Sequence, residues 1–242
     1  MNIIRKVLCV VFVFQFVSCA ELQQVINQLP SEGISNDQIG NGLKEALTNG
    51  ITNQVSILAL KDGFFENELV KILLPEELRE VERTLRNIGL SKVADEGLKV
   101  LNRAAEDAVK KATPIFVDAI KGMTISDGKT ILLGSDNAAT TFLQKKTSEA
   151  LYQKFNPIIK NSFQKVGADK IWSELISKYN SLPLTRNVNP DLTEYVTGES
   201  LKGVYKMVEV EEKEIRNNLN KRTSDLLKKV FALQDRQSLK QL

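Results

Sequence analysis

Apolar side chains recur every three or four residues along most of this chain, a spacing that places them on one face of an α-helix. The clearest run follows Ser35, whose hydroxyl suits a helix N-cap, and consists of Ile39, Leu43, Leu47, Ile51 and Val55. This spacing predicts an all-α protein that forms a single compact multi-helix domain over residues 34–233. A frayed C-terminal tail is expected over residues 234–242.

Prolines indicate where helices begin and end. Pro75 suits the first turn of the helix that follows it. Asn156-Pro157 pairs a capping residue with a proline, so we expect one helix to end there and another to begin. Residues 68–74 are too few for a stable helix, and one very short strand pair is compatible with them. Residues 180–191 contain two prolines and little periodicity, which predicts a loop.

Residues 1–18 have the composition of a signal peptide. Arg5 and Lys6 precede a largely apolar stretch of 11 residues, 7–17, whereas a membrane-spanning helix needs ~20. The segment Ser18-Cys19-Ala20 follows, and it resembles the site at which bacteria cleave a lipoprotein precursor and acylate the new N-terminal cysteine. The sequence therefore predicts lipid attachment, palmitate included, at Cys19. The alternative is a cleaved periplasmic protein with an incidental cysteine.

An acylated Cys19 would determine where the protein lies. Two or more acyl chains hold a protein stably on a membrane, whereas one chain binds only marginally. Residues 19–33 would then form a lipidated tether. We expect a lipoprotein of the cell envelope, attached to the outer membrane through Cys19 and facing the periplasm, with an envelope protein as a possible partner.

The charge of the chain argues against nucleic acid as a partner. Removal of residues 1–18, which hold two basic residues and no acidic one, lowers the formal charge from +3 to +1. A protein that binds nucleic acid needs a basic face that displaces counterions from phosphates. We therefore expect no nucleic-acid binding.

The sequence contains no histidine. This absence excludes Ser-His-Asp and Cys-His catalysis and histidine-ligated zinc. Once Cys9 leaves with the signal peptide and Cys19 is acylated, the domain has neither a free thiol nor a disulfide. A bound metal would need oxygen ligands, which suits calcium or magnesium, and no cofactor is predicted.

One polar cluster interrupts an apolar helical pattern. Asn102, Arg103 and Glu106 follow one another closely, and Arg103 and Glu106 are three residues apart, so their side chains can pair on one helix face. With Asp118, they are candidates for a ligand site in a cleft between helices. The alternative is a structural network of satisfied hydrogen bonds.

A second polar segment surrounds a glycine turn that enters a helix. Its candidate residues are Asp127, Ser135, Asp136 and Asn137. Free amides at a helix N-terminus can bind an anion, and the two aspartates suit a hard cation instead. The third interpretation is that Ser135 or Asp136 caps its own helix. Farther along the chain, Glu209, Glu211, Glu212 and Glu214 near Arg216 are expected to form a solvent-facing acidic surface.

Several segments together resemble the bacterial family called domain of unknown function 4197. The matching segments include Gly42-Leu43-Lys44-Glu45-Ala46-Leu47, Leu101-Asn102-Arg103-Ala104-Ala105-Glu106, Asp136-Asn137-Ala138-Ala139-Thr140 and Leu226-Leu227-Lys228-Lys229-Val230-Phe231. The resemblance extends from about Ile34 to Phe231 and implies a single helical domain in an exported, lipoprotein-like protein. It brings no activity, cofactor or catalytic residue.

Three functions are consistent with these features. The leading hypothesis is a non-catalytic, lipid-anchored binding or scaffold module of the envelope. The second is a domain that binds a lipid or small molecule in a cleft between helices. The third is a histidine-free hydrolase that uses carboxylates or a hard cation.

Overall fold

The computed structural model describes residues 34–166 except 88 and 90, residues 172, 173, 176, 177 and 180, and residues 191–239. The expected signal peptide, the lipid site at Cys19, the tether and most of the expected loop at 180–191 lie outside these residues. Among the residues that are described, no helix is long and apolar enough to cross a membrane.

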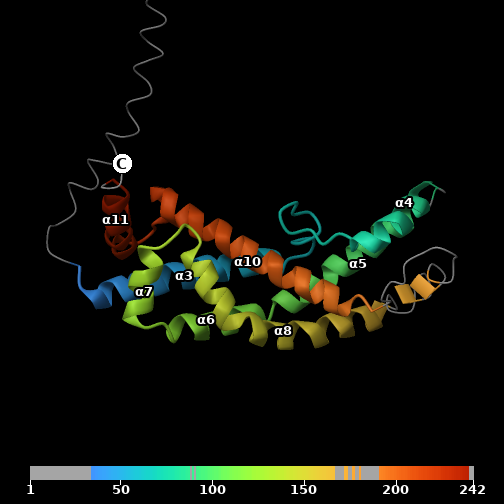
Figure 1. Ribbon diagram of the computed structural model, residues 1–242, viewed down its shortest axis with the longest axis horizontal. Coiled ribbons are helices and arrows are strands. Elements are labelled where there is room, and N and C mark those ends of the chain that lie inside the picture. Colours follow the sequence, from blue (N-terminus) through green and yellow to red (C-terminus); the bar gives the residue numbers. More distant parts are fainter. Residues whose placement is uncertain are drawn as a thin grey trace, which may run out of the picture.

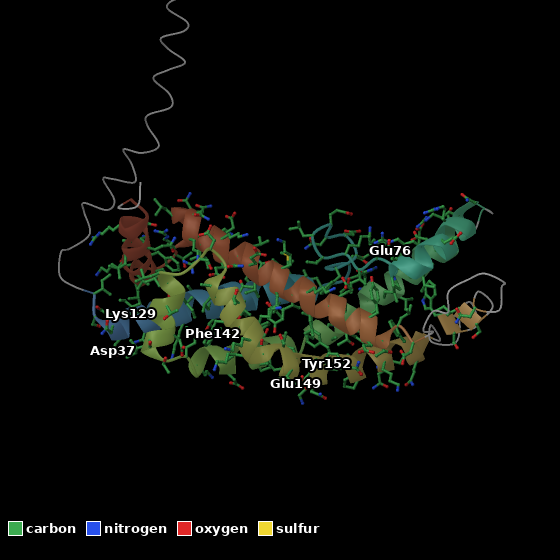
Figure 2. The ribbon with its side chains drawn as sticks, viewed as in Figure 1. Asp37, Glu76, Lys129, Phe142, Glu149 and Tyr152 are labelled. Carbon is green, nitrogen blue, oxygen red and sulfur yellow. The ribbon has the colours of Figure 1, made fainter. Side chains whose placement is uncertain are left out.

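The described chain is built from helices, which confirms the all-α prediction. They are α3 (Asn36–Leu58), α4 (Arg79–Asn87), α5 (Ser91–Val109), α6 (Ala112–Lys121), α7 (Ile125–Leu132), α8 (Ala138–Val166), α10 (Thr193–Asn217) and α11 (Asp225–Leu239), with short 3₁₀ turns at Glu76–Leu78 and Leu219–Lys221. Figure 1 shows α3, α8 and α10 running along the long axis, with α11 at one end and α4 at the other. Side chains cover both long faces of this arrangement, with Asp37 and Lys129 toward the α11 end (Figure 2).

Helix α3 follows its sequence pattern closely. The Ser35 hydroxyl accepts a hydrogen bond from the Gln38 amide, and the Gln38 side chain accepts one from the Ser35 amide, which completes a capping box. The five apolar residues predicted to share one face are all buried. They belong to one hydrophobic core that other helices also line, among them α8 through Phe155 and α6 through Phe116.

The predicted break at Asn156-Pro157 is wrong, because α8 continues through Pro157. Proline removes one helical hydrogen bond and normally kinks or ends a helix. Here Phe155 and Ile159, on either side of the proline, are both 0% exposed. In addition, the Asn156 amide donates a 3.4 Å hydrogen bond to Thr197 of α10. Packing on both sides of the proline therefore outweighs the lost hydrogen bond.

The strand pair expected near 68–74 is not formed. Residues 71–75 have no regular secondary structure, and the backbone of Ile72 is hydrogen-bonded to a side chain instead of a strand. The Ile72 amide donates to Asn102 Oδ1 at 2.8 Å, and Asn102 Nδ2 donates to the Ile72 carbonyl at 2.8 Å. A carboxamide carries both an acceptor and donors, so it can replace the backbone of a neighbouring strand.

Helix α11 extends to Leu239, so most of the segment expected to be a frayed tail is helical. Two side chains in this segment are bound to buried arginines. Gln234 accepts a 2.9 Å hydrogen bond from Arg216, and Asp235 pairs with Arg222 at 2.6 Å. These contacts hold the last helix against α10 and the turn that follows it.

Candidate functional site

The predicted cluster residues on α5, Asn102, Arg103 and Glu106, all contact one loop. This loop, residues 59–75, connects α3 to the 3₁₀ turn before α4. Arg103 pairs with Glu106 at 2.7 Å and with Asp62 of the loop at 3.2 Å. The other oxygen of Glu106 accepts a 3.2 Å hydrogen bond from the Phe64 amide. Asp118 is exposed on α6 and contributes none of these contacts.

Burial dominates the electrostatics of this cluster. Glu106 is 1% exposed, and burial raises the pKa of its carboxyl group above the ordinary value, against the opposing effects of the Phe64 amide and the Arg103 charge. Asn102 is 0% exposed and also donates to the Leu98 carbonyl at 2.8 Å. The described polar contacts of Asn102, Arg103 and Glu106 are thus made within the protein, and several of them connect α5 to loop 59–75.

The loop itself is held in one conformation by a tight turn. Asp62 has a φ of 64°, in the left-handed region that few residues other than glycine adopt. At Gly63, a Cβ would lie 2.4 Å from the Ile57 carbonyl oxygen, so the turn requires glycine there. These two residues therefore set the path of the chain where the loop turns away from α3.

The second predicted cluster is not brought together as one site. Asp127 belongs to the capping box of α7, where hydrogen bonds from the Thr124 hydroxyl and amide lower the pKa of its carboxyl group. Ser135, Asp136 and Asn137 are exposed, and Ser135 donates a 3.0 Å hydrogen bond to Asn137. Within the described residues, no group of three or more acidic, histidine or cysteine side chains is arranged to hold a metal ion.

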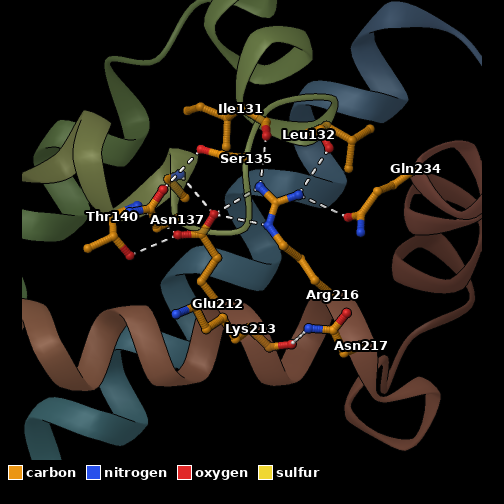
Figure 3. Close-up of polar contacts among 11 residues, drawn as sticks. Ile131, Leu132, Ser135, Asn137, Thr140, Glu212, Lys213, Arg216, Asn217 and Gln234 are labelled. Carbon is orange, nitrogen blue, oxygen red and sulfur yellow. Dashed lines mark hydrogen bonds and ion pairs between the residues drawn. The ribbon is translucent and has the colours of Figure 1, made fainter. Parts of the chain in front are cut away.

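The helix N-terminus predicted to bind an anion is occupied by the protein's own carboxylate (Figure 3). Glu212 accepts hydrogen bonds from the Ala139 amide at 2.9 Å, the Thr140 amide at 2.8 Å and the Thr140 hydroxyl at 2.8 Å. It therefore satisfies the free amides of α8 and complements the positive end of the helix dipole. An external anion has no place at these amides.

Arg216 completes this junction. Its guanidinium donates two hydrogen bonds to Glu212 and one each to the Ile131 and Leu132 carbonyls at the end of α7. The prediction of a solvent-facing acidic surface is wrong for Glu211 and Glu212, which are 9% and 5% exposed. The sequence does indicate that Glu212 is buried, because Glu212 lies four residues after Val208 in the apolar stripe of α10.

The surface where loop 59–75 meets α10 holds a pocket of about 310 Å³. It is lined by Leu69, Val70 and Lys71 from the loop and by Glu199, Lys202, Gly203 and Lys206 from α10. Each lysine also pairs with a glutamate three residues away: Lys71 with Glu68 at 3.7 Å, Lys202 with Glu199 at 2.6 Å, and Lys206 with Glu209 at 3.3 Å. The Lys71 ammonium lies 4.6 Å from the centre of the Phe65 ring.

The loop that contributes Leu69 to this pocket carries two further exposed leucines. Leu60, Leu69 and Leu73 are 63%, 60% and 49% exposed, and Ile57 at the end of α3 is 40% exposed. We call these leucines, together with Lys71, Lys202 and Lys206, the loop–α10 surface. Sequence patterning did not identify it, because a leucine in a loop carries no periodicity that indicates whether it is buried.

Comparison with known proteins agrees with the predicted resemblance. A family described as "Protein of unknown function (DUF4197)" matches residues 33–232 of the chain. No curated protein and no solved structure matches it. The matched range contains both polar clusters and the whole of the loop–α10 surface.

Proposed function

Because the chain belongs to the DUF4197 family, whose description names no activity, we propose a function from the arrangement of its own residues. We propose that it is a lipid-anchored, non-catalytic binding protein of the bacterial envelope, held to the outer membrane through Cys19. It binds its partner through the loop–α10 surface.

The observation that carries this proposal is a group of exposed apolar residues at the end of α3 and in the loop that follows, one of which, Leu69, lines a pocket between this loop and α10. Exposed apolar side chains that cluster beside polar ones are typical of interaction sites. Four large apolar residues between positions 57 and 73 are at least 40% exposed. The turn at Gly63 and the hydrogen bonds of Asn102 to Ile72 hold this loop in place before a partner arrives, which lowers the entropy cost of binding.

The positions of the acidic residues favour binding over catalysis. A hydrolase without histidine needs at least two carboxyl groups that converge in a cleft. The buried carboxylates Glu106 and Glu212 are instead bound to arginines and backbone amides. The third buried carboxylate, Glu211, accepts a 2.6 Å hydrogen bond from the Gln54 side chain. The loop–α10 pocket has one acidic residue in its lining, Glu199.

Two measurements on cells test the proposal. First, mass spectrometry of the mature protein should find acyl chains on Cys19, and a Cys19→Ala variant should leave the membrane fraction. Second, a photo-crosslinking amino acid placed at Leu73 should form adducts in cells. The same amino acid at Ile125, which is 45% exposed on α7, is the matched control. Equal adduct yields at the two positions would contradict binding through the loop–α10 surface.

A further inference from the structure

Glu211 is a buried carboxylate for which the described residues supply no cation. It is 9% exposed and lies where α10 packs against α3, with its Cγ 2.8 Å from the position that a Cβ on Gly50 would take. The other two buried glutamates of the described chain, Glu106 and Glu212, each form an ion pair with an arginine. A buried charge is costly unless it is paired, so Glu211 differs from both in lacking its countercharge.

Gln54 of α3 takes the place of the missing cation. It is 7% exposed, and its Nε2 donates a 2.6 Å hydrogen bond to Glu211 Oε2. In this orientation Gln54 Oε1 faces no donor, and it is the one buried side-chain polar atom without a hydrogen bond among the described residues. The second oxygen of Glu211 has no described partner and is not buried in this sense, so it still reaches solvent. Two acceptor oxygens from two helices therefore lack donors at one place.

This pair of residues lies next to the exposed apolar residues at the end of α3. Ile57, which is 40% exposed, follows Gln54 by three positions and so lies on the same helix face. On α10, Met207 precedes Glu211 by four positions, and its sulfur accepts a 3.8 Å hydrogen bond from Asn67 of the loop that carries the exposed leucines. The two oxygens are therefore one helical turn from exposed apolar surface on α3 and one turn from the loop on α10.

The chemistry of the pair favours a guanidinium group as its ligand. Two acceptors without donors require a group that only donates, and a guanidinium has N–H donors in a planar fork and no acceptor. It also gives up its hydration more readily than an ammonium group. The protein itself pairs its other two buried glutamates with arginine. A hard metal ion is a poorer match, because it takes about six or more oxygen ligands, far more than this pair offers.

We propose that Glu211 and Gln54 bind an arginine side chain of the protein partner, whose guanidinium replaces the Gln54 amide on the Glu211 carboxylate. Gln54, released from Glu211, then turns its oxygen toward the same guanidinium. This inference rests on the proposed binding function and names one chemical group of its partner. Arginine is enriched among the residues that contribute most to interfaces, and apolar neighbours such as Ile57 exclude water from its ion pair.

The experiment uses N-acetyl-arginine amide as the probe and N-acetyl-citrulline amide, which has the same shape without the charge, as the control compound. Both are titrated into the full chain in detergent, and NMR follows the side-chain amide of Gln54 and the methyl groups of Ile57. We expect saturable shifts at both residues with the arginine compound, and binding of the citrulline compound weaker by about ten-fold or more. Glu211→Gln should weaken binding of the arginine compound by a similar factor. Glu214→Gln, at an exposed acidic residue of the same helix, should leave it unchanged.

Equal affinities for the two compounds would overturn the arginine site, as would shifts that persist unchanged in Glu211→Gln. The comparison of the compounds on the wild type needs no substitution, so it decides the question even if Glu211→Gln does not fold. If the arginine compound does not bind while Leu73 still crosslinks in cells in preference to Ile125, the arginine site fails and the proposed binding function stands. If the compound binds while Leu73 and Ile125 crosslink equally, the arginine site stands and the proposed binding surface fails.

Discussion

The carboxylate of Glu212 and the guanidinium of Arg216 form an ion pair of 2.8 Å in which the two side chains are 4% and 2% exposed. The two residues are one helical turn apart on α10. Together they join the N-terminus of α8 to the C-terminal carbonyls of α7 and to Gln234 of α11. One pair of side chains thus connects four helices at one end of the molecule.

Removal of the cation from this pair should be strongly destabilising. Arg216→Met would leave the Glu212 carboxylate buried without its countercharge, at a cost of about 3–5 kcal/mol in the free energy of unfolding. Urea unfolding followed by circular dichroism measures this cost. The double variant with Glu212→Gln should lose less than the sum of the two single variants. Arg83→Met, at an exposed arginine of α4, is the control, and an equally small effect at both arginines would contradict the assignment.

Asn102 should hold the segment of loop 59–75 around Ile72 in place. Asn102→Ala leaves the Ile72 amide and carbonyl without their partner, so we expect a loss of about 1–3 kcal/mol in stability. Hydrogen exchange at the Ile72 amide should also become faster. Asn53→Ala, at an exposed position of α3, should change neither quantity. Unchanged protection of Ile72 in Asn102→Ala would show that other contacts hold the loop.

Two glycines of α10 should respond in opposite directions to the same substitution. At Gly198 nothing lies within 4 Å of a new Cβ, so Gly198→Ala should stabilise the protein by about 0.5–1 kcal/mol through higher helix propensity. At Gly203 a Cβ would lie 2.8 Å from the fully buried Phe64 ring, and overpacking typically costs about 1–3 kcal/mol. Thermal unfolding of both variants tests this, and a stabilised Gly203→Ala would contradict the close contact of loop and helix.

The stability of the protein should depend on pH through Glu106. Burial raises the pKa of this carboxyl group in the folded protein above its ordinary value of 4.5. Between these two values the folded state binds more protons than the unfolded state, so the free energy of unfolding falls as pH rises. The free energy of unfolding of the wild type, compared with that of Glu106→Gln, should therefore be highest at pH values below the ordinary pKa of 4.5. This difference should fall as the pH rises toward neutral.

Urea unfolding of both proteins at several pH values gives the difference between their free energies of unfolding. The contributions of the other titrating groups largely cancel in this difference. An advantage that grows with pH would instead mean that the ion pair with Arg103 outweighs the burial of the charge.

Much of the helical architecture could be predicted from the sequence. The buried face of α3 and its capping box at Ser35, and the start of α7 at Thr124, follow from residues within four positions of one another. Such features depend on local backbone geometry and on local side chains. The burial of Glu212 on α10 could have been predicted in the same way, because Glu212 continues the apolar stripe of its helix.

The remaining features were decided by tertiary structure. The sequence by itself determined that the chain is helical, where several of its helices begin, and which face of α3 is buried in the core, because helical periodicity is a local property. Tertiary packing decided that α8 continues through Pro157 and that Asn102 replaces a strand. It also decided that the amides of α8 bind Glu212. The last two contacts join residues 30 and 72 positions apart. No local pattern determines which distant group will satisfy a buried polar atom, because that depends on how the helices pack.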